Sequence, residues 1–365
     1  MNTNQRVIYK QPYAQAMQEQ LLEWGSRRVL LATNTSLSGP SGLANQVREA
    51  IGKQWTGTVE GLGAHAPRAD VIRLVKAIEH HQADSLVGLG GGSVTSVVKA
   101  ARLALANEVR DVDGIDRLIG KVELSSAILP CIMLPTTLSA GEFTTSVGVT
   151  NQLTRRKQAM HHPSLAPNTV VLDPALTLNT PPALWFSTAI RALDHIVETW
   201  CSSEATPLSD ATSLHGLRLL LHGLKNNERL SCQEGAWLAI QGIATGVPQG
   251  ASHGIGHALG GIAGVGHGDT SCIMLAHVLR FNFPVNALRQ QQLANEWEEG
   301  GGELDKHIDK LVRSLRLPQT LRETGISKDV LSQVAREAMN NPWVILNPRK
   351  FSSEKEMLEL LQAAW

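Results

Sequence analysis

Short apolar runs with strand character alternate with amphipathic stretches through the first part of the chain. Two of the intervening stretches, residues 43–51 and 68–81, carry apolar residues at helical spacing. Parallel strands need crossover connections, and these stretches are long enough to supply them. The strands that we expect most clearly are residues 28–33, 85–90, 127–134 and 169–172. The pattern predicts βα units around a parallel sheet.

Beyond Asp173-Pro174 the strand pattern fades and longer helical patterns follow. We expect helices over residues 183–201, 209–222, 234–244, 288–297, 304–315 and 328–339. Ser352 or Ser353 is a suitable capping residue for a last helix that runs nearly to Trp365. The fold class expected is therefore an α/β domain over residues 1–175 and an all-α domain over residues 176–365.

The composition is that of an enzyme-sized globular protein. The chain has 365 residues, of which 42% are hydrophobic, so disorder is excluded as the main state. Thirty-three basic residues balance thirty-three acidic ones. No global field attracts nucleic acid or an anionic membrane, and an anionic ligand needs a local site.

The four cysteines lie in apolar contexts without CxxC spacing. This usage favours reduced, buried thiols over a zinc ribbon and is typical of the cytoplasm. The N-terminal residues have no apolar core of signal-peptide length, and no stretch reaches the roughly 20 apolar residues of a membrane span. We expect a soluble cytoplasmic protein.

A glycine-rich turn follows the strand predicted at residues 85–90. Gly91, Gly92 and Ser93 come directly before a helical stretch. Glycines allow backbone N–H groups to approach a ligand, and a helix N-terminus favours phosphate, so a nucleotide pyrophosphate fits here. The alternative is a tight βα turn without a ligand. The segment does not match the GxGxxG fingerprint of ordinary Rossmann domains.

A second polar loop, containing Thr136, Thr137 and Ser139, follows the strand predicted at residues 127–134. Its hydroxyl groups are able to line a cofactor groove, although a plain polar loop has the same composition. Both loops follow strands, so both are expected at the carboxyl edge of the sheet, where open α/β proteins bind ligands.

Histidines gather in the second part of the chain. His253 and His257 are four residues apart, which places them on one face of a helix, and His267 follows across a glycine-rich link. His195 is a further candidate. Neutral imidazoles bind metals and also transfer protons, so both kinds of site stay open. Satisfied core histidines are the alternative.

These motifs, in this order, resemble the iron-containing alcohol dehydrogenase superfamily. The resemblance implies a Rossmann-like N-terminal domain and a helical C-terminal domain, the dehydroquinate synthase-like architecture. It also implies that Gly91, Gly92 and Ser93 bind the pyrophosphate, that Thr136, Thr137 and Ser139 lie beside the nucleotide, and that Lys157 lies near the ribose. His257 matches the position that the family places near nicotinamide and substrate.

One position departs from the family pattern. In metal-dependent relatives an aspartate and three histidines hold the ion, and the aspartate lies four residues before the first histidine. Here that position is Arg191, four residues before His195. Asp194 points about 100° away from His195 on a helix and is not expected to share its face. Because a guanidinium repels a cation, we expect the iron site to be lost or badly weakened.

The maleylacetate reductase branch of the superfamily acts on carboxylated ketones or enones and is thought not to require the metal, so it offers a precedent. Arg191 can polarise a carbonyl oxygen in place of a Lewis acid, or grip a substrate carboxylate. An arginine paired with a nearby acid as structural support is the alternative.

We therefore expect an NAD(P)H-dependent reductase of a small carbonyl or conjugated carbonyl substrate, with no metal. Arg191 stabilises the oxygen, and His257, with His195, His253 or His267, supplies the proton. Asn34 ends the first strand where relatives often carry an acidic residue, so both NAD and NADP stay open. A homodimer is suggested by the resemblance. The rivals are a metal-dependent alcohol dehydrogenase and a non-redox nucleotide-binding relative.

Overall fold

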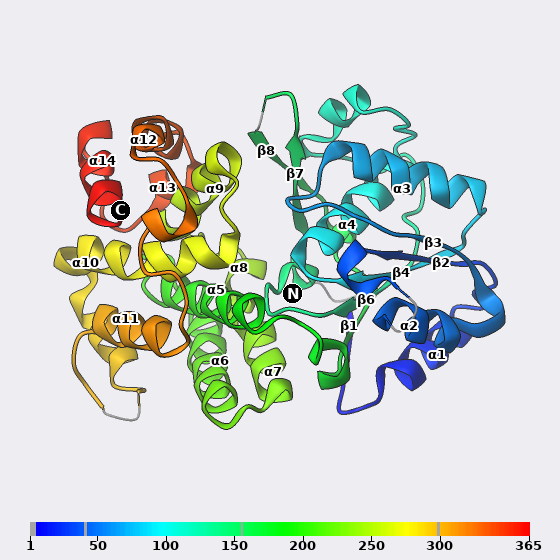
Figure 1. Cartoon of the computed structure of the whole chain (residues 1–365), viewed down its shortest axis with the longest axis horizontal. Helices are drawn as coiled ribbons and strands as arrows, with labels where there is room; N and C mark the ends of the chain where they lie inside the picture. The colour runs from blue at the N-terminus through cyan, green and yellow to red at the C-terminus, as the bar shows by residue number, and fades with distance from the viewer. Residues whose placement is uncertain (1–4, 40–41, 155, 298–299) are drawn as a thin grey trace. The chain divides into compact units, whose positions relative to one another are not determined.

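The computed structural model describes residues 5–39, 42–154, 156–297 and 300–365. The chain folds as two compact units, Met1–Thr180 and Pro181–Trp365, which are described one at a time (Figure 1).

The first unit is built on a parallel sheet. Within the described residues the sheet has six strands, in the order β1 (Arg6–Tyr9), β9 (Thr169–Leu172), β6 (Cys131–Pro135), β4 (Ser85–Gly90), β2 (Val29–Thr33) and β3 (Trp55–Val59). All neighbouring strands in this order pair in parallel. Strands β2, β4 and β6 are buried along their whole length, as expected when helices cover both faces of a parallel sheet.

Helices cover the two faces of this sheet. Alternate residues of β4 show the arrangement, because successive side chains of a strand point to opposite faces. Val87 and Leu89 pack into a core with residues of α1 (Tyr13–Glu23) and α2 (Leu43–Ile51). The intervening Gly88 lies against Val98 of α4 (Gly92–Ala106), and α4 packs in turn on α3 (Arg68–His80).

A smaller sheet and several short 3-10 turns complete the first unit. The smaller sheet has the strand order β5 (Gly120–Lys121), β8 (Arg156–His161) and β7 (Ser146–Asn151), with β7 and β8 antiparallel. The 3-10 turns are η1 (Thr35–Leu37), η2 (Gly52–Gln54), η3 (Asp113–Leu118), η4 (Gly141–Phe143), η5 (Pro163–Leu165) and η6 (Pro174–Thr177).

The second unit is helical throughout its described residues (Figure 1). Its α-helices are α5 (Pro182–Trp200), α6 (Pro207–Asn226), α7 (Arg229–Ala239), α8 (Gln241–Ala244), α9 (Ala251–Ala263), α10 (His267–Ala294), α11 (Leu304–Ser314), α12 (Leu331–Met339), α13 (Pro342–Leu346) and α14 (Glu354–Ala363). Two 3-10 turns, η7 (Arg322–Thr324) and η8 (Lys328–Val330), precede α12. Apolar residues of α9, α10, α12 and α14 form one buried core.

The fold class predicted from the sequence is confirmed, and the local differences have physical causes. The strand expected from residue 127 begins only at Cys131, after Pro130. The helix expected over residues 234–244 is interrupted at Ile240, between α7 and α8. The helix expected from residue 288 is the end of α10, which continues past a kink at Asn286 that follows Pro284. Ser353 is the residue that caps α14.

No helix among the described residues has both the length and the apolar content needed to cross a bilayer.

Candidate active site

The two predicted cofactor loops lie at the carboxyl ends of adjacent strands. Strand β2 pairs with β3 on one side and with β4 on the other, so the strand order changes direction beside β2. Ligands of open α/β sheets bind at such a point. Gly90, the last residue of β4, pairs with Pro135, the last residue of β6, which brings the glycine turn beside the Thr136–Ser139 loop.

The glycine turn and the polar loop are in close contact. A Cβ atom on Gly91 would lie 2.9 Å from both Cγ2 and Oγ1 of Thr137, and one on Gly92 would lie 3.0 Å from Ser139 Oγ. Gly91 is the residue before α4, whose first backbone N–H groups have no partner within the helix. Only glycine fits this turn without displacing the loop, and the turn ends at a helix N-terminus suited to an anion.

The hydroxyl groups of this region are partly engaged. Ser93 Oγ accepts a hydrogen bond from the backbone N–H of His65 at 3.1 Å. The hydroxyls of Thr137 and Ser139 lie 3.1 Å apart, and Thr136, which is buried, accepts a hydrogen bond from Thr180 Oγ1 at its carbonyl oxygen. Hydrogen bonds within the protein therefore hold part of this loop.

The other two predicted cofactor residues, Asn34 and Lys157, belong to different elements of the first unit. Asn34 follows β2, and its side chain caps η1 by accepting from the Leu37 N–H at 3.2 Å. Lys157 lies in β8, where its side chain extends over Gly148 of β7. The carbonyl oxygen of the Asn34 side chain is therefore used by the protein itself.

In the second unit, helix α5 aligns one buried polar face. Arg191, Asp194, His195 and Glu198 follow one another at spacings of three, one and three residues, and each is at most 8% exposed. Arg191 Nη1 donates to Ser271 Oγ at 3.1 Å and lies 3.7 Å from Asp194 Oδ2. Ser271 donates in turn to Asp194 Oδ2 at 2.6 Å.

Asp194 makes more contacts in this cluster than the sequence analysis expected. Its Oδ2 lies 3.5 Å from Nδ1 of His253 and accepts a hydrogen bond of 2.8 Å from Ser252. The angular offset between Asp194 and His195 holds on the helix, but the helices α9 and α10 that pack against α5 supply partners on that side as well. The carboxylate compensates the charge of Arg191.

The histidines form two ring pairs. His195 stacks on His253 with 4.9 Å between ring centroids, and His257 lies 5.5 Å from His267. Trp343 connects the pairs, because its ring lies 4.4 Å from His257 and 6.2 Å, edge on, from His253. All four predicted histidines therefore belong to one neighbourhood in the second unit.

Glycines of α9 permit this packing. A Cβ on Gly254 would lie 2.6 Å from Val344 Cγ2, so the absence of a side chain lets α13 approach and places Trp343 on His257. A Cβ on Gly256 would lie 2.7 Å from Thr270 Oγ1 and 3.8 Å from Arg191 Nη1. Arg191 thus lies beside the turn of α9 that separates the two histidines.

The neighbouring charges shift the pKa values of the two stacked imidazoles, His195 and His253, in opposite directions. Burial lowers the pKa of His195 well below its ordinary value, and the positive neighbours His253 and Arg191 lower it further. Burial and Arg191 also oppose a charge on His253, yet the carboxylates of Asp194 and Glu198 outweigh them and raise its pKa. His195 is therefore neutral, whereas His253 favours the protonated state more than a free histidine does.

Three buried ligand-type side chains of this cluster lie close together. One oxygen each of Asp194 and Glu198 and one nitrogen of His253 all lie within 4.8 Å of one another. However, the carboxylate oxygens already accept hydrogen bonds from the hydroxyl of Ser252, from backbone N–H groups and from the imidazole of His253. The guanidinium of Arg191 lies beside them. Asp194 Oδ2 and both oxygens of Glu198 therefore already take part in an ion-pair and hydrogen-bond network of the protein itself.

The sequence analysis missed four residues of this site: Glu198, Ser252, Ser271 and Trp343. Glu198 was detectable, because it lies seven residues after Arg191 and three after His195 on the same helix. Ser271 also follows His267 by one helical turn. Trp343 carried no such signal, since only the fold brings α13 to α9.

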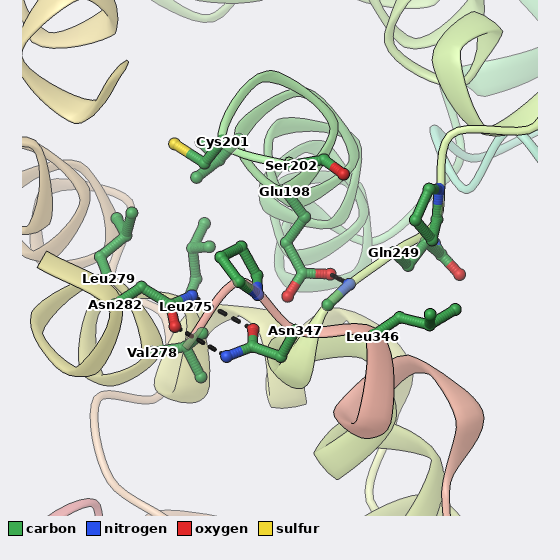
Figure 2. A pocket seen from close by; sticks show the side chains of 14 residues that line it. Glu198, Cys201, Ser202, Gln249, Leu275, Val278, Leu279, Asn282, Leu346 and Asn347 are labelled. Atoms are coloured by element: carbon green, nitrogen blue, oxygen red, sulfur yellow. Dashed lines mark hydrogen bonds between the residues drawn. The ribbon is translucent and has the colours of Figure 1, made fainter. Parts of the chain in front are cut away.

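A small pocket that is lined in part by Glu198 has none of the four site histidines in its wall. It is lined by residues of α5 and α10 and of the segments that flank α9 and α13, and its volume of about 10 Å³ corresponds to roughly one water molecule (Figure 2). Figure 2 shows the Glu198 carboxylate beside a backbone nitrogen and the paired amides of Asn282 and Asn347. Neither Arg191 nor any of the four histidines lines this pocket.

Comparisons with known proteins cover nearly the whole chain. A family model described as iron-containing alcohol dehydrogenase matches residues 4–174, and one described as the C-terminal part of the Fe-containing alcohol dehydrogenase family matches residues 186–365. Dehydrogenase FUM7 of Gibberella moniliformis (strain M3125 / FGSC 7600) is 33% identical, over 100% of this chain and 97% of that protein.

Two further relatives are more distant. Maleylacetate reductase 1 of Cupriavidus pinatubonensis (strain JMP 134 / LMG 1197) is 26% identical, over 96% of this chain and 92% of that protein. The crystal structure of sulfoacetaldehyde reductase from Bifidobacterium kashiwanohense in complex with NAD+ shares the fold, with a TM-score of 0.86 at 20% identity over 99% of this chain and 97% of that one. This chain is an oxidoreductase of the iron-containing alcohol dehydrogenase family.

Proposed function

We propose that the protein reduces a carbonyl or conjugated carbonyl substrate with NADH or NADPH, as a maleylacetate reductase-like enzyme that works without a catalytic metal. The observation that carries the proposal is the buried guanidinium of Arg191 beside the histidine helix α9. The similarity to maleylacetate reductase 1 supports the substrate class.

The first unit supports the cofactor. The contact of Gly91 and Gly92 with Thr137 and Ser139 leaves a narrow backbone turn at the N-terminus of α4, which suits a pyrophosphate. The similar sulfoacetaldehyde reductase is in complex with NAD+. Asn34 adds no carboxylate that would repel a 2′-phosphate, so both cofactor forms are included.

In the proposed reaction a reduced nicotinamide, when bound, would supply a hydride to the carbonyl carbon. Arg191 donates hydrogen bonds to the carbonyl oxygen as the C=O π bond breaks and negative charge develops there. His257, which is only partly buried, gives that oxygen a proton and is left as a neutral imidazole. The products are the alcohol and the oxidised nicotinamide.

In the proposed reaction Arg191 supplies the positive charge at the substrate oxygen. A guanidinium has five N–H donors and keeps its proton, and burial lowers its pKa while Asp194 and Glu198 oppose that change. Its one hydrogen-bond acceptor among the described residues is Ser271. Donors therefore remain to bind a substrate oxygen.

One observation favours the metal-dependent rival. Asp194 Oδ1, His195 Nδ1 and His253 Nε2 are buried and have no hydrogen-bond partner among the described residues. Buried polar atoms normally have one, so a bound ion or water would account for these three. Metal content and activity before and after treatment with a chelator distinguish the two functions.

The cofactor site is tested by Gly91→Ala. Because the new Cβ would lie 2.9 Å from Thr137, either the loop or the turn has to move, and we expect the Kd for NADH to rise about tenfold or more, which corresponds to roughly 1.4 kcal/mol. Titration followed by nicotinamide fluorescence measures this Kd.

The matched control is Gly141→Ala, because a Cβ at Gly141 meets no atom within 4 Å. Its Kd should equal that of the wild type. Equal binding by the Gly91 variant would show that this turn does not hold the cofactor, and no binding of either nicotinamide by the wild type would remove the proposal.

The homodimer and the cytoplasmic location remain predictions. All four cysteines are buried free thiols, which supports a reducing compartment.

A further inference from the structure

Glu198 makes contacts that no part of the proposed reaction uses. Its Oε1 accepts from the backbone N–H of Ser252 at 2.7 Å, and its Oε2 accepts from the N–H of Gly250 at 2.7 Å and lies 2.7 Å from Nδ1 of His253. The side chain is 6% exposed. Both carboxylate oxygens are therefore directed at the start of α9.

These contacts hold the N-terminus of α9. Helix α9 follows Gly250, and a glycine has no side chain with which to cap the orphan N–H groups of the first turn. Glu198 of α5 takes two of them, and Asn347 Oδ1 takes the N–H of Ala251 at 3.0 Å. A carboxylate at this end also faces the positive end of the helix dipole.

The same carboxylate decides which nitrogen of His253 carries a proton. Carboxylate oxygens only accept hydrogen bonds, so Nδ1 of His253 must donate to Glu198. The stacked His195 lies on the ring face of His253, and the turn that follows carries His257. One residue of α5 thus contacts both Nδ1 of His253 and the first turn of the helix that bears the proposed proton donor.

We propose that Glu198 is a positioning residue for the reaction: it keeps the proton of His253 on Nδ1 and fixes the first turn of α9, so that His257 meets the substrate in one orientation. The inference rests on the proposed function for its effect on catalysis. Its geometric part, the protonated Nδ1, is independent of that function.

The substitution that tests this role is Glu198→Gln, which keeps the size of the side chain. The amide has one oxygen and one NH2 group, so it cannot accept on both sides, and its NH2 group faces either a backbone N–H or Nδ1. Glu198→Asp keeps the charge but is one methylene shorter. The control is Asp305→Asn, which removes a carboxylate that is equally buried in the same unit and bonded to Arg280.

Steady-state kinetics give the first readout. We expect Glu198→Gln to lower kcat about 10- to 100-fold, the usual cost of losing an orienting partner, with KM changed far less and with the Kd for NADH unchanged. Glu198→Asp should recover part of kcat. The Asp305→Asn control should keep kcat within about twofold of the wild type, since the described contacts of Asp305 are with Arg280 and Lys306 and include none of the four site histidines.

The second readout is the 15N chemical shift of the His253 ring, assigned by comparison with a His253→Asn variant. The wild type should show a protonated Nδ1 throughout the range of pH in which the protein is folded, and Glu198→Gln should shift the proton toward Nε2. A wild-type signal with the proton on Nε2 alone would overturn the inference, and so would a folded Glu198→Gln variant with wild-type kcat.

The two proposals fail in different ways. If the wild type reduces no carbonyl compound with either nicotinamide, the proposed function fails, while the 15N spectrum of the wild type still tests the contact between Glu198 and His253. If the wild type is active and Glu198→Gln loses no more activity than Asp305→Asn, the positioning role fails and the proposed function stands.

Discussion

Replacing Arg191 with alanine is expected to lower kcat for carbonyl reduction by about 100- to 1,000-fold. This is the usual effect of removing one donor from a site that stabilises a developing oxyanion. In this protein the guanidinium is buried beside helix α9, and no lysine side chain takes part in the described polar cluster around it. Steady-state kinetics with a panel of aldehydes, ketones and enones measure the effect.

Two controls test whether the loss of kcat comes from the contact with the substrate oxygen. Arg191 belongs to the second unit, so the Kd for NADH should change little. Arg191→Lys should restore only part of kcat, because an ammonium group keeps the charge but lacks the planar fork of donors. Wild-type activity in a folded Arg191→Ala variant would show that Arg191 is only a structural partner of Asp194.

Replacing Asp194 with leucine is expected to lower the free energy of unfolding by about 3–5 kcal/mol, the range found when one partner of a buried ion pair is removed. Asp194 is fully buried, and its Oδ2 accepts from Ser252 and Ser271 and faces both Arg191 and His253. Without the carboxylate of Asp194, the buried guanidinium of Arg191 loses the negative charge that lies 3.7 Å from it and compensates its own charge. Urea unfolding measures the change.

A double-variant cycle separates the charge from the loss of packing. The variant Arg191→Met/Asp194→Leu removes both charges, so it should be more stable than Asp194→Leu alone even though it carries one more substitution. Strict additivity of the two single effects would show that Arg191 and Asp194 do not stabilise each other in the folded protein.

Most of the fold followed from local patterns. The runs that become β2, β4 and β6 are short, apolar and bounded by turns, and these patterns need no knowledge of the partner strands. The hairpin of β7 and β8 was not predicted, because Ser146–Asn151 and Arg156–His161 mix polar and apolar residues and obtain their order from pairing with each other. The length of α10 was missed because Pro284 divides its sequence pattern.

Within the candidate site, the sequence predicted only those relations that hold between residues of the same helix. The spacing of His253 and His257 and the position of Arg191 relative to His195 are visible in the sequence. The stack of His195 on His253 and the contact of Trp343 with His257 depend on how α5, α9 and α13 pack. The contacts of Asp194 with Ser252, Ser271 and His253 were not predicted, because helical angles describe one helix and not the partners that surround it.

We propose that a guanidinium, and not a metal ion, provides the positive charge at the reacting carbonyl. The most direct test is the metal content of the purified enzyme, measured together with kcat before and after dialysis against a chelator. We predict substoichiometric iron and zinc and an unchanged kcat. One equivalent of metal per chain, with activity that disappears on chelation and returns when that metal is added back, would contradict it.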